Sequence, residues 1–350
     1  MLKAAIIGAG YIAREHLDAL RSLRDVRIAG ICDLSPTLAE AAAEEFGAET
    51  HWTDHRRMLA EVQPDVLHVT TPPKSHVPLA LDGIAAGAHV LIEKPIATDA
   101  AELERLLSAA RERGRVIVED YNYLFNPPVQ RILALIESGD FGDVVHVDVH
   151  FCVPILGPGS IHADPNAPGP FAGLPGGAVV DFITHLAYLT HAFVGAHRAT
   201  HTSWRNRSGN AAVPYDEFRA LIDAERGTAC LGFSAHAQPD VFSLRVFGTK
   251  MRASASLFEP LLSIEKLRGG PPPLQPVMNG LAVARAHTRS ALSGLYRKLQ
   301  GKPGTYQGLW VLLEKLYGSI AAGEAPPITP ERITAVNQLV GALLRDAERQ

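Results

Sequence analysis

The sequence has 350 residues, of which 47% are hydrophobic and 20% charged, and its formal net charge is −4. This composition is typical of a globular enzyme with a sizeable core, and the length predicts two domains. The weak negative charge gives no electrostatic reason to expect nucleic acid or an anionic membrane as a partner. No stretch approaches the roughly 18–20 apolar residues of a membrane span. The N-terminus also lacks the apolar core and cleavage site of a signal peptide.

The cysteines indicate the compartment. Cys32, Cys152 and Cys230 form an odd, widely spaced set without the spacing of a metal site. Such a set is typical of reduced thiols in the cytosol rather than of a disulfide framework. We therefore expect a cytoplasmic protein that holds no metal.

The first 120 residues alternate between strand-like and helix-like segments. Apolar runs bounded by turn residues predict strands over 3–8, 26–32, 65–71, 89–93 and 115–120. Helical patterns lie between them at 11–24, 36–46, 55–62, 76–87 and 99–113. Ser35 and Pro36 are a start signal for the second helix, and Gly87 is an end signal for the fourth. Strands that alternate with helices in this way predict a doubly wound parallel sheet of the α/β class.

The pattern changes after residue 120, so we expect a dinucleotide-binding domain over 1–120 and a second α/β domain over 121–350. Helices are predicted near 126–139 and 178–195, and a strand over 143–151. Further strands are predicted at 213–224, 228–237, 240–248 and 251–258, close enough in sequence for antiparallel pairing. Two C-terminal helices at 305–323 and 329–348 could pack back on the first domain.

The segment 154–177 is too rich in proline and glycine for regular structure. A loop of this length in a compact domain is usually functional. We predict that it is a substrate lid, with His162 and Asp164 as polar groups that could reach a substrate.

A dinucleotide signal lies between the first strand and the first helix. Gly8, Gly10 and Ala13 form a G-x-G-x-x-A pattern, in which the glycines allow a tight turn and close approach of a pyrophosphate. The phosphates would meet the N–H groups where the helix begins. We therefore predict that Gly8, Gly10, Tyr11 and Ile12 bind a cofactor; a purely structural turn is the alternative.

Asp33 bears on the type of cofactor. It ends the second strand, where a carboxylate can accept hydrogen bonds from the adenosine ribose and repel a 2′-phosphate. Leu34, Ser35 and Pro36 offer no cation to hold such a phosphate. We predict NAD as the cofactor, in preference to NADP.

The chain resembles the glucose–fructose oxidoreductase / inositol dehydrogenase (Gfo/Idh/MocA) family. The resemblance is carried by "GAGYIA" at 8–13, "TPPKSHVPLAL" at 71–81, "EKP" at 93–95 and "GGAVVDFITH" at 176–185. It implies a Rossmann domain followed by an α/β domain with an open, mostly antiparallel sheet. It further implies that the lysine of EKP lies near the nicotinamide and that a D-x-x-x-H helix faces it.

Carried over to this sequence, the resemblance makes Lys94, Asp181 and His185 the catalytic candidates. It adds to the cofactor-binding candidates the residues Thr71, Pro72, His76, Glu93 and Lys94.

Lys94 also stands out on physical grounds. It follows a buried strand, and ligands of open parallel sheets bind at the carboxyl ends of the strands. Glu93 could orient or balance the ammonium group, and Pro95 could fix the chain direction, for which a cis peptide bond is one route. The alternative is an ordinary Lys–Glu pair on the surface.

Asp181 and His185 are four residues apart, hence on one face of a helix, where the carboxylate can orient the imidazole and raise its basicity. A helix-surface hydrogen bond or a satisfied core histidine is the alternative, and a metal site lacks a third ligand. Three positions depart from the family pattern: Ile183 replaces a frequent glycine, Tyr188 a frequent acid, and Leu124 a frequent arginine.

The reaction that these residues predict is hydride transfer between nicotinamide and the hydroxyl or keto carbon of a sugar, polyol or related hydroxylated substrate. His185 would exchange the hydroxyl proton and Lys94 would stabilise the same oxygen, although these two roles could be reversed. The remaining substrate-binding candidates are Tyr121, Asn122, Tyr123, His162 and Asp181.

Two rival functions stay open at this stage. A tightly bound NAD could be used transiently for elimination or epimerisation, or the protein could be a catalytically silent NAD-binding regulator. We expect a homo-oligomer, either a dimer or a tetramer. The basic helical segment 279–300 could cover the sheet, form an oligomer contact, or bind a membrane or another partner.

Overall fold

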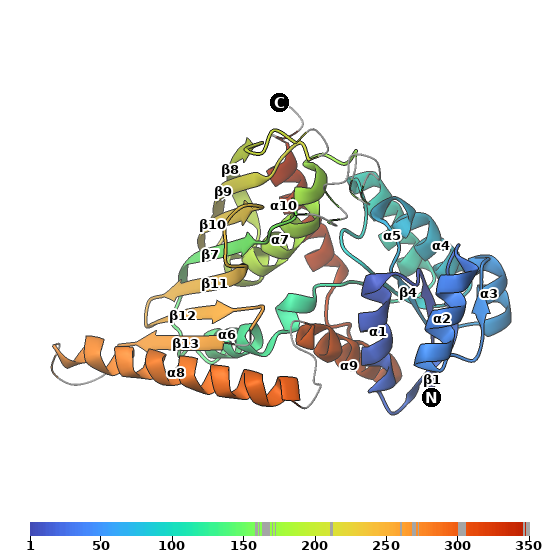
Figure 1. The fold of residues 1–350 in the computed structure, drawn as a ribbon, viewed down its shortest axis with the longest axis horizontal. Coiled ribbons are helices and arrows are strands. Elements are labelled where there is room, and N and C mark those ends of the chain that lie inside the picture. The colour runs from blue at the N-terminus through green and yellow to red at the C-terminus, as the bar shows by residue number, and fades with distance from the viewer. Residues whose placement is uncertain are drawn as a thin grey trace. The chain divides into compact units, whose positions relative to one another are not determined.

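A computed structural model divides the chain into two compact units (Figure 1). The first consists of Met1–Tyr121 with Leu309–Asn337, and the second of Asn122–Gly308 with Gln338–Gln350. The structure describes all residues except 158, 159, 161, 163–168, 170, 172, 211, 212, 260, 268–270, 272, 300–305, 346 and 348–350. A C-terminal segment therefore belongs to the same compact unit as the N-terminal domain.

The first unit is built on a parallel sheet with the strand order β3-β2-β1-β4-β5-β6. Its strands are β1 (Leu2–Ile7), β2 (Val26–Cys32), β3 (His51–Trp52), β4 (Val66–Val69), β5 (His89–Ile92) and β6 (Ile117–Glu119). Its helices are α1 (Tyr11–Arg21), α2 (Pro36–Phe46), α3 (His55–Val62), α4 (His76–Ala85), α5 (Ala100–Glu112) and α9 (Gln307–Ala322). The predicted doubly wound parallel sheet is confirmed, because the strand order reverses between β1 and β4.

Local signals explain several helix ends. The Ser35 hydroxyl accepts a hydrogen bond from the Leu38 N–H, and Pro36 is the first residue of α2. Helix α2 ends at Gly47, whose φ of +69° favours glycine. Strand β3 was missed from the sequence because two residues are too short to show a period.

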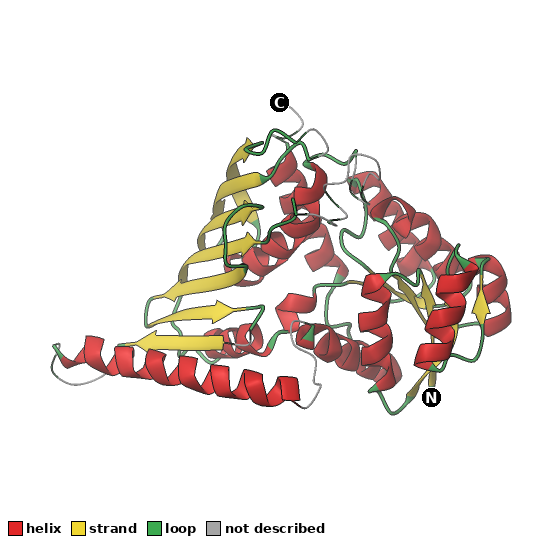
Figure 2. Cartoon of the chain, viewed as in Figure 1, coloured by secondary structure: helices red, strands yellow, loops and turns green. Residues whose placement is uncertain are grey.

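The second unit contains a sheet with the order β13-β12-β11-β7-β10-β9-β8, in which only β7 and β10 pair in parallel among the described strands. Its strands are β7 (Val144–Cys152), β8 (His197–Arg205), β9 (Glu217–Ala224), β10 (Gly227–Ser234), β11 (Val241–Gly248), β12 (Met251–Ser256) and β13 (Leu261–Lys266). Its helices are α6 (Pro127–Glu137), α7 (Val180–Val194) and α8 (Leu274–Leu299), and α10 (Pro330–Leu344) runs from the first unit into the second. The predicted open, mostly antiparallel sheet is confirmed (Figure 2).

Helix α7 packs against β7 and β10 and supplies much of this unit's core. The segment Gly177–Val194 is long and apolar enough to cross a membrane, contrary to the expectation from the sequence. However, 83% of that segment is buried inside the protein. This burial is typical of a core helix. It also limits the part of α7 from which polar side chains can reach a ligand.

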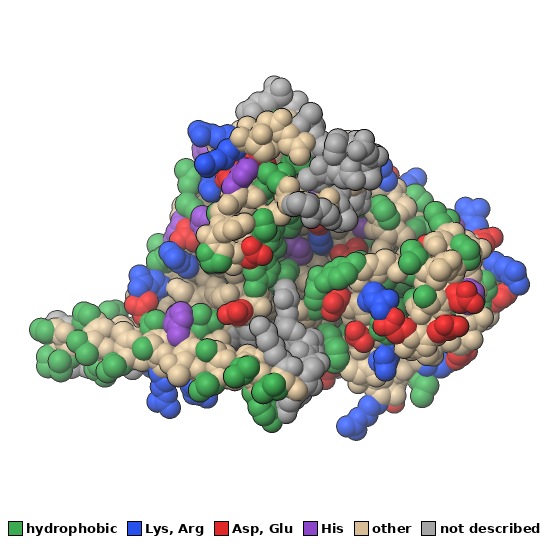
Figure 3. All heavy atoms as spheres, in the orientation of Figure 1, with side chains coloured by type: hydrophobic (Ala, Val, Ile, Leu, Met, Phe, Trp, Pro, Cys, Tyr) green, Lys and Arg blue, Asp and Glu red, His purple; other side chains and the backbone are tan. Residues whose placement is uncertain are grey.

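Helix α8 lies along the edge strand β13 (Figure 1). The Asn279 amide accepts a hydrogen bond from the Lys266 N–H at 3.4 Å and donates one to the Lys266 carbonyl at 3.2 Å. Of the alternatives for segment 279–300, the structure therefore shows a helix that covers a sheet edge. Apolar side chains remain exposed along it (Figure 3), namely Leu274, Val277, Met278, Leu281, Leu292, Leu295, Tyr296 and Leu299.

The predicted lid, 154–177, falls partly outside the described residues. Asp164 is among those not described. His162 is described, and its position is reported with the candidate site below.

Candidate active site

The glycine-rich loop after β1 has the geometry that a bound dinucleotide needs. Gly8 has a φ of +96°, and a Cβ there would lie 2.8 Å from the Thr70 carbonyl oxygen, so only glycine fits. A Cβ on Gly10 would meet nothing within 4 Å, and no side chain caps the start of α1 at this residue. The loop thus offers uncapped backbone N–H groups beside an open position, which suits a pyrophosphate. Tyr11 is exposed and Ile12 is half-buried at the same helix start.

Asp33 is fixed beside this loop by two backbone donors. One carboxylate oxygen accepts a hydrogen bond from the Ala9 N–H at 2.7 Å, and the other accepts one from the Ser35 N–H at 2.8 Å. The carboxylate is half-buried and thus places a negative charge at the end of β2. Each oxygen retains a further lone pair for a ribose hydroxyl.

His76 ties together the loops that follow β4 and β5. Its Nδ1 lies 2.8 Å from the Pro95 carbonyl oxygen and its Nε2 lies 2.6 Å from the Thr71 carbonyl oxygen. Burial lowers the pKa of His76, while the two carbonyl contacts oppose this effect. The ring is fully buried, so it acts as a strut that holds Thr71 and Pro72 next to the EKP segment. Direct contact of His76 with a cofactor remains a prediction.

Lys94 is the second residue after β5 and is half-buried. The Lys94–Pro95 peptide bond is cis. The charge of the Lys94 ammonium helps to lower the pKa of Glu93 and opposes the rise in the pKa of Glu119 and Asp120, so Lys94 lies within electrostatic reach of all three carboxyls. The lysine therefore carries its charge above a buried acidic cluster at the carboxyl end of the sheet.

Glu93 is the end of a buried hydrogen-bonded chain. His16 Nε2 lies 3.0 Å from Glu93 Oε1, His16 Nδ1 lies 2.9 Å from His68 Nδ1, and His68 Nε2 lies 2.9 Å from the Tyr317 hydroxyl. A carboxylate only accepts, so His16 donates from Nε2. His16, His68 and Tyr317 thus form a continuous chain from α9 through β4 and α1 to Glu93.

The pKa values of the two buried acids beside His16 are shifted in opposite directions. Burial raises the pKa of Glu93, but the hydrogen bond from His16 and the charges of His16 and Lys94 outweigh it and hold that pKa at about 2. Burial and the charge of Glu93 raise the pKa of Asp120 well above its usual range. We infer that Glu93 is ionised and that Asp120 keeps its proton, which it donates to Glu93.

The same three side chains, His16, Glu93 and Asp120, lie close enough to hold a metal ion. Each is at most 6% exposed, and Glu93 is already neutralised by His16 and Lys94. The arrangement therefore fits a positioning network for Lys94 better than a metal site.

In the second unit, the partner of His185 is Tyr188, one turn further along α7. The Tyr188 hydroxyl lies 2.9 Å from His185 Nδ1. It donates to the Asn122 side-chain oxygen at 3.2 Å and accepts from the Tyr123 N–H at 3.2 Å. A hydroxyl has one proton, and with that proton directed to Asn122 we infer that His185 donates from Nδ1. Nε2 is then left with the lone pair, which is the form a general base requires.

Asp181 and His162 form a second pair near the start of α7. His162 Nε2 lies 3.7 Å from Asp181 Oδ2, and the His162 ring packs beside Phe171 and Phe182. The sequence hypothesis made Asp181 the residue that orients His185. The described contacts give that role at Nδ1 to Tyr188, and they place the Asp181 carboxylate next to His162.

The three side chains of segment 121–123 have different contacts. The Tyr121 hydroxyl donates to Glu119 at 2.7 Å and the ring is fully buried. Asn122 holds Tyr188, while the Tyr123 ring meets His185 edge-on with its centroid 5.0 Å away. All three side chains thus support the candidate groups, and any substrate contact by them remains a prediction.

Comparison with known proteins decides the family. The model of the oxidoreductase family, NAD-binding Rossmann fold, matches residues 2–121, and that of the GFO/IDH/MocA C-terminal domain matches residues 129–254. The chain belongs to the GFO/IDH/MocA family. This membership confirms the resemblance that the four sequence motifs indicated.

Curated relatives and solved structures agree with this family. The chain is 32% identical over 144 residues to D-glucoside 3-dehydrogenase of Escherichia coli strain K12, covering 41% of each protein. It is 34% identical over 150 residues to inositol 2-dehydrogenase of Gluconacetobacter diazotrophicus, covering 42% of this chain and 44% of that protein. The alignments thus span less than half of these relatives.

A solved structure extends the likeness to the whole fold. The WlbA dehydrogenase of Bordetella pertussis, in complex with NADH and UDP-GlcNAcA, superposes with a TM-score of 0.79 at 20% identity. The match covers 99% of this chain and 96% of that one. At this identity the likeness supports the fold alone.

Proposed function

We propose that this protein is an NAD-dependent oxidoreductase that transfers a hydride between nicotinamide and a hydroxyl or keto carbon of a sugar, polyol or related hydroxylated substrate. The observation that carries the proposal is the hydrogen bonding of His185. Its Nδ1 donates to Tyr188, so Nε2 holds a lone pair for a hydroxyl proton. A silent regulator has no need for an imidazole held in one tautomer.

His185 and Lys94 have different roles in the proposed reaction. In the oxidative direction, His185 Nε2 takes the proton of the substrate hydroxyl as the carbon–oxygen double bond forms. Lys94 donates a hydrogen bond to the same oxygen and stabilises its developing negative charge. In the reductive direction, the imidazolium returns the proton. When bound, the nicotinamide ring supplies the acceptor or donor of the hydride.

The buried chain behind Lys94 supports this role. An ionised Glu93, held by His16, places a negative charge within electrostatic reach of the Lys94 ammonium group. Protonated Asp120 limits the local negative charge to what the lysine can balance. We propose that the cluster holds Lys94 in place for this role.

NAD is the proposed cofactor because Asp33 places a fixed carboxylate beside the glycine loop. Gly8, Gly10, Tyr11 and Ile12 would hold the phosphates at the start of α1. The carboxylate of Asp33 would accept hydrogen bonds from the ribose hydroxyls and repel a 2′-phosphate.

The proposed substrate class rests on the named relatives, a D-glucoside 3-dehydrogenase, an inositol 2-dehydrogenase and a D-apiose dehydrogenase. Asp181 and His162 are the proposed contacts for further substrate hydroxyls. Carboxylate and imidazole groups suit such hydroxyls because they accept and donate hydrogen bonds at short range.

A spectrophotometric screen tests the proposal. The purified protein is incubated with NAD or NADP and a panel of sugars, polyols and sugar nucleotides, and NADH formation is recorded. We expect reduction of NAD with at least one member of the panel. Conversion of substrate without net NADH would instead indicate transient oxidation, and binding of NAD without any conversion would indicate a regulator.

We further propose that the protein is cytoplasmic and forms a homo-oligomer, a dimer or a tetramer. The exposed apolar side chains of α8 support self-association, since such residues are usually covered. Light scattering after size-exclusion chromatography measures the number of chains, and a monomer at micromolar concentration would refute this part.

A further inference from the structure

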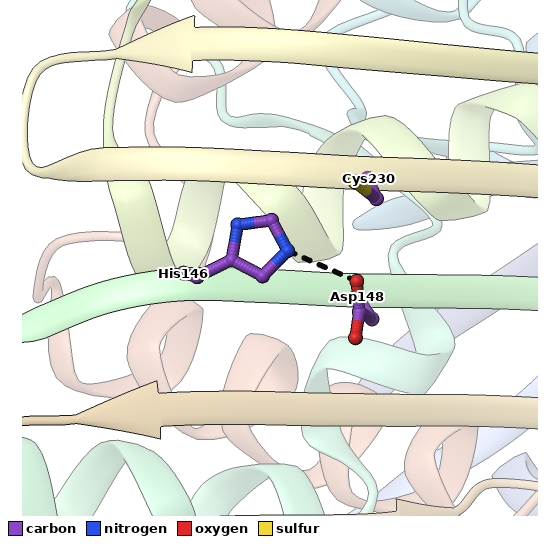
Figure 4. Close-up of side chains that lie close together, drawn as sticks. All are labelled: His146, Asp148 and Cys230. Carbon is purple, nitrogen blue, oxygen red and sulfur yellow. Dashed lines mark hydrogen bonds and ion pairs between the residues drawn. The ribbon is translucent and has the colours of Figure 1, made fainter.

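A cluster of metal-binding side chains lies on the central parallel strand pair of the second unit. His146 and Asp148 are two residues apart on β7, so both point to the same face. Cys230 on β10 stands directly opposite Asp148 in the pairing register. Figure 4 shows the three side chains gathered over the two strands. Their imidazole nitrogen, carboxylate oxygen and sulfur atoms all lie within 4.8 Å of one another.

We propose that His146, Asp148 and Cys230 bind one divalent transition-metal ion, with Zn²⁺ as the best match. Nitrogen, oxygen and thiolate sulfur are its usual ligands, and three protein ligands leave a fourth position for water. A tetrahedral ion with bonds of about 2.0–2.2 Å to nitrogen and oxygen separates these two atoms by roughly 3.3 Å. In the structure, His146 Nε2 and Asp148 Oδ1 are 3.0 Å apart.

The other ring nitrogen of His146 is already oriented for this role. Nδ1 lies 2.7 Å from the Thr228 hydroxyl, which stands opposite His146 on β10. Without an ion, Nε2 donates to the Asp148 carboxylate, which only accepts. An ion at Nε2 shifts the imidazole proton to Nδ1, which then donates to Thr228, as in most metal-bound histidines. The ligands therefore have a supporting contact as well as proximity.

The site is accessible and separate from the candidate catalytic groups. The His146 and Asp148 side chains are 28% and 23% exposed, so an ion can enter from solvent. Along β7 the alternate residues Val147, Val149 and Phe151 are buried on the opposite face. The His185 ring stacks against Phe151 on that buried face. An ion at His146 would therefore not contact His185.

One neighbour opposes the ion. Arg245 stands opposite Asp148 on β11, and its positive charge reduces the attraction of the site for a cation. The site is therefore expected to bind with micromolar rather than picomolar affinity. This neighbour also provides a variant that should strengthen binding.

The test uses the full-length protein after removal of metal with a chelator. Isothermal titration with zinc chloride should show one ion per chain. Cobalt(II), used as a spectroscopic probe, should give a thiolate-to-metal charge-transfer band. The variants His146→Ala and Cys230→Ser should weaken binding by roughly 100-fold and Thr228→Val by about 10-fold, as loss of a supporting contact does elsewhere.

Matched variants separate ligation from general damage. Cys152→Ser, which removes a thiol from the same strand as His146, should keep both affinity and the cobalt band. Arg245→Ala should tighten zinc binding several-fold, an effect that damage to the fold would not produce. Absence of binding by the unmodified protein would overturn the proposal, as would a charge-transfer band that persists in Cys230→Ser.

Discussion

The hydroxyl of Tyr188 lies 2.9 Å from Nδ1 of His185, and the same hydroxyl donates to Asn122. From this arrangement we infer that the imidazole is a donor at Nδ1 and an acceptor at Nε2. The residue expected at position 188 from the family pattern was an acid. A phenol at this position contacts the ring without adding a negative charge.

Removal of this hydroxyl should therefore impair turnover rather than cofactor binding. We expect Tyr188→Phe to lower kcat by about 10- to 100-fold, because a poorly oriented His185 should keep only part of the rate enhancement that a general base contributes. The limb of the pH–rate profile assigned to His185 should shift, while KM for NAD should stay within about twofold. Tyr296→Phe, an exposed tyrosine on α8, is the matched control. An unchanged pH profile in Tyr188→Phe would refute the orienting role.

The pair of His16 and Glu93 should matter far more for stability than a surface pair of the same type. His16→Leu removes the histidine hydrogen bond from the buried Glu93 carboxylate and should lower the free energy of unfolding by about 3–5 kcal/mol. His55→Leu removes a half-exposed partner of Asp82 and should cost about 0–1 kcal/mol. Urea unfolding measures both values. Equal losses in the two variants would show that the buried chain contributes nothing specific.

Glu119 should make stability depend on pH in a defined direction. Burial raises its pKa from 4.5 to about 7, against the hydrogen bonds from Tyr121 and Ile96. The folded protein therefore binds this proton more tightly than the unfolded chain does. Its stabilising contribution is complete below pH 4.5 and is lost as the pH rises through 7. The loss amounts to roughly 3 kcal/mol, since one pKa unit corresponds to about 1.4 kcal/mol.

The variant Glu119→Gln should not show this pH-dependent loss of stability, because glutamine does not titrate. The difference in unfolding free energy between the unmodified protein and Glu119→Gln, measured by urea unfolding, should shift in favour of the variant between pH 4.5 and pH 7.5. Glu112→Gln, at an exposed position on α5, is the control and should show no such shift. A difference that stays constant across this range would mean that Glu119 titrates normally.

Asp33 should control the choice between the two nicotinamide cofactors. Asp33→Ala removes the carboxylate that would repel a 2′-phosphate, so affinity for NAD should fall and discrimination against NADP should shrink by about tenfold. Dissociation constants for both cofactors can be measured by fluorescence titration. Tighter binding of NADP than of NAD by the unmodified protein would contradict the assignment.

Much of the first unit was predictable because its signals are local. Buried strands such as β4 and β5 appear as apolar runs, and the ends of α2 carry a capping serine and a glycine. Strand β8 was missed because most of its residues are half-buried or exposed, so no apolar alternation shows in the sequence. The helical spacing of Asp181 and His185 likewise placed both on α7.

The contacts that complete the candidate site were not predictable in the same way. His16, His68 and Tyr317 come from α1, β4 and α9, and only the folded unit brings them together behind Glu93. Tyr188 had a usable signal, since it lies three residues after His185 and hence on the same helical face. His146 and Cys230 meet through strand register, which a single sequence does not reveal.

The most direct test of the proposed mechanism is the turnover of Lys94→Ala, His185→Ala and the double variant on a substrate found in the screen. Each single variant should lose about 100- to 10,000-fold in kcat with little change in NAD affinity, because each group acts mainly in the transition state. The double variant should lose less than the product of the two single losses, since in the proposed mechanism both groups serve one oxygen. Turnover near that of the unmodified protein in either single variant would contradict the account.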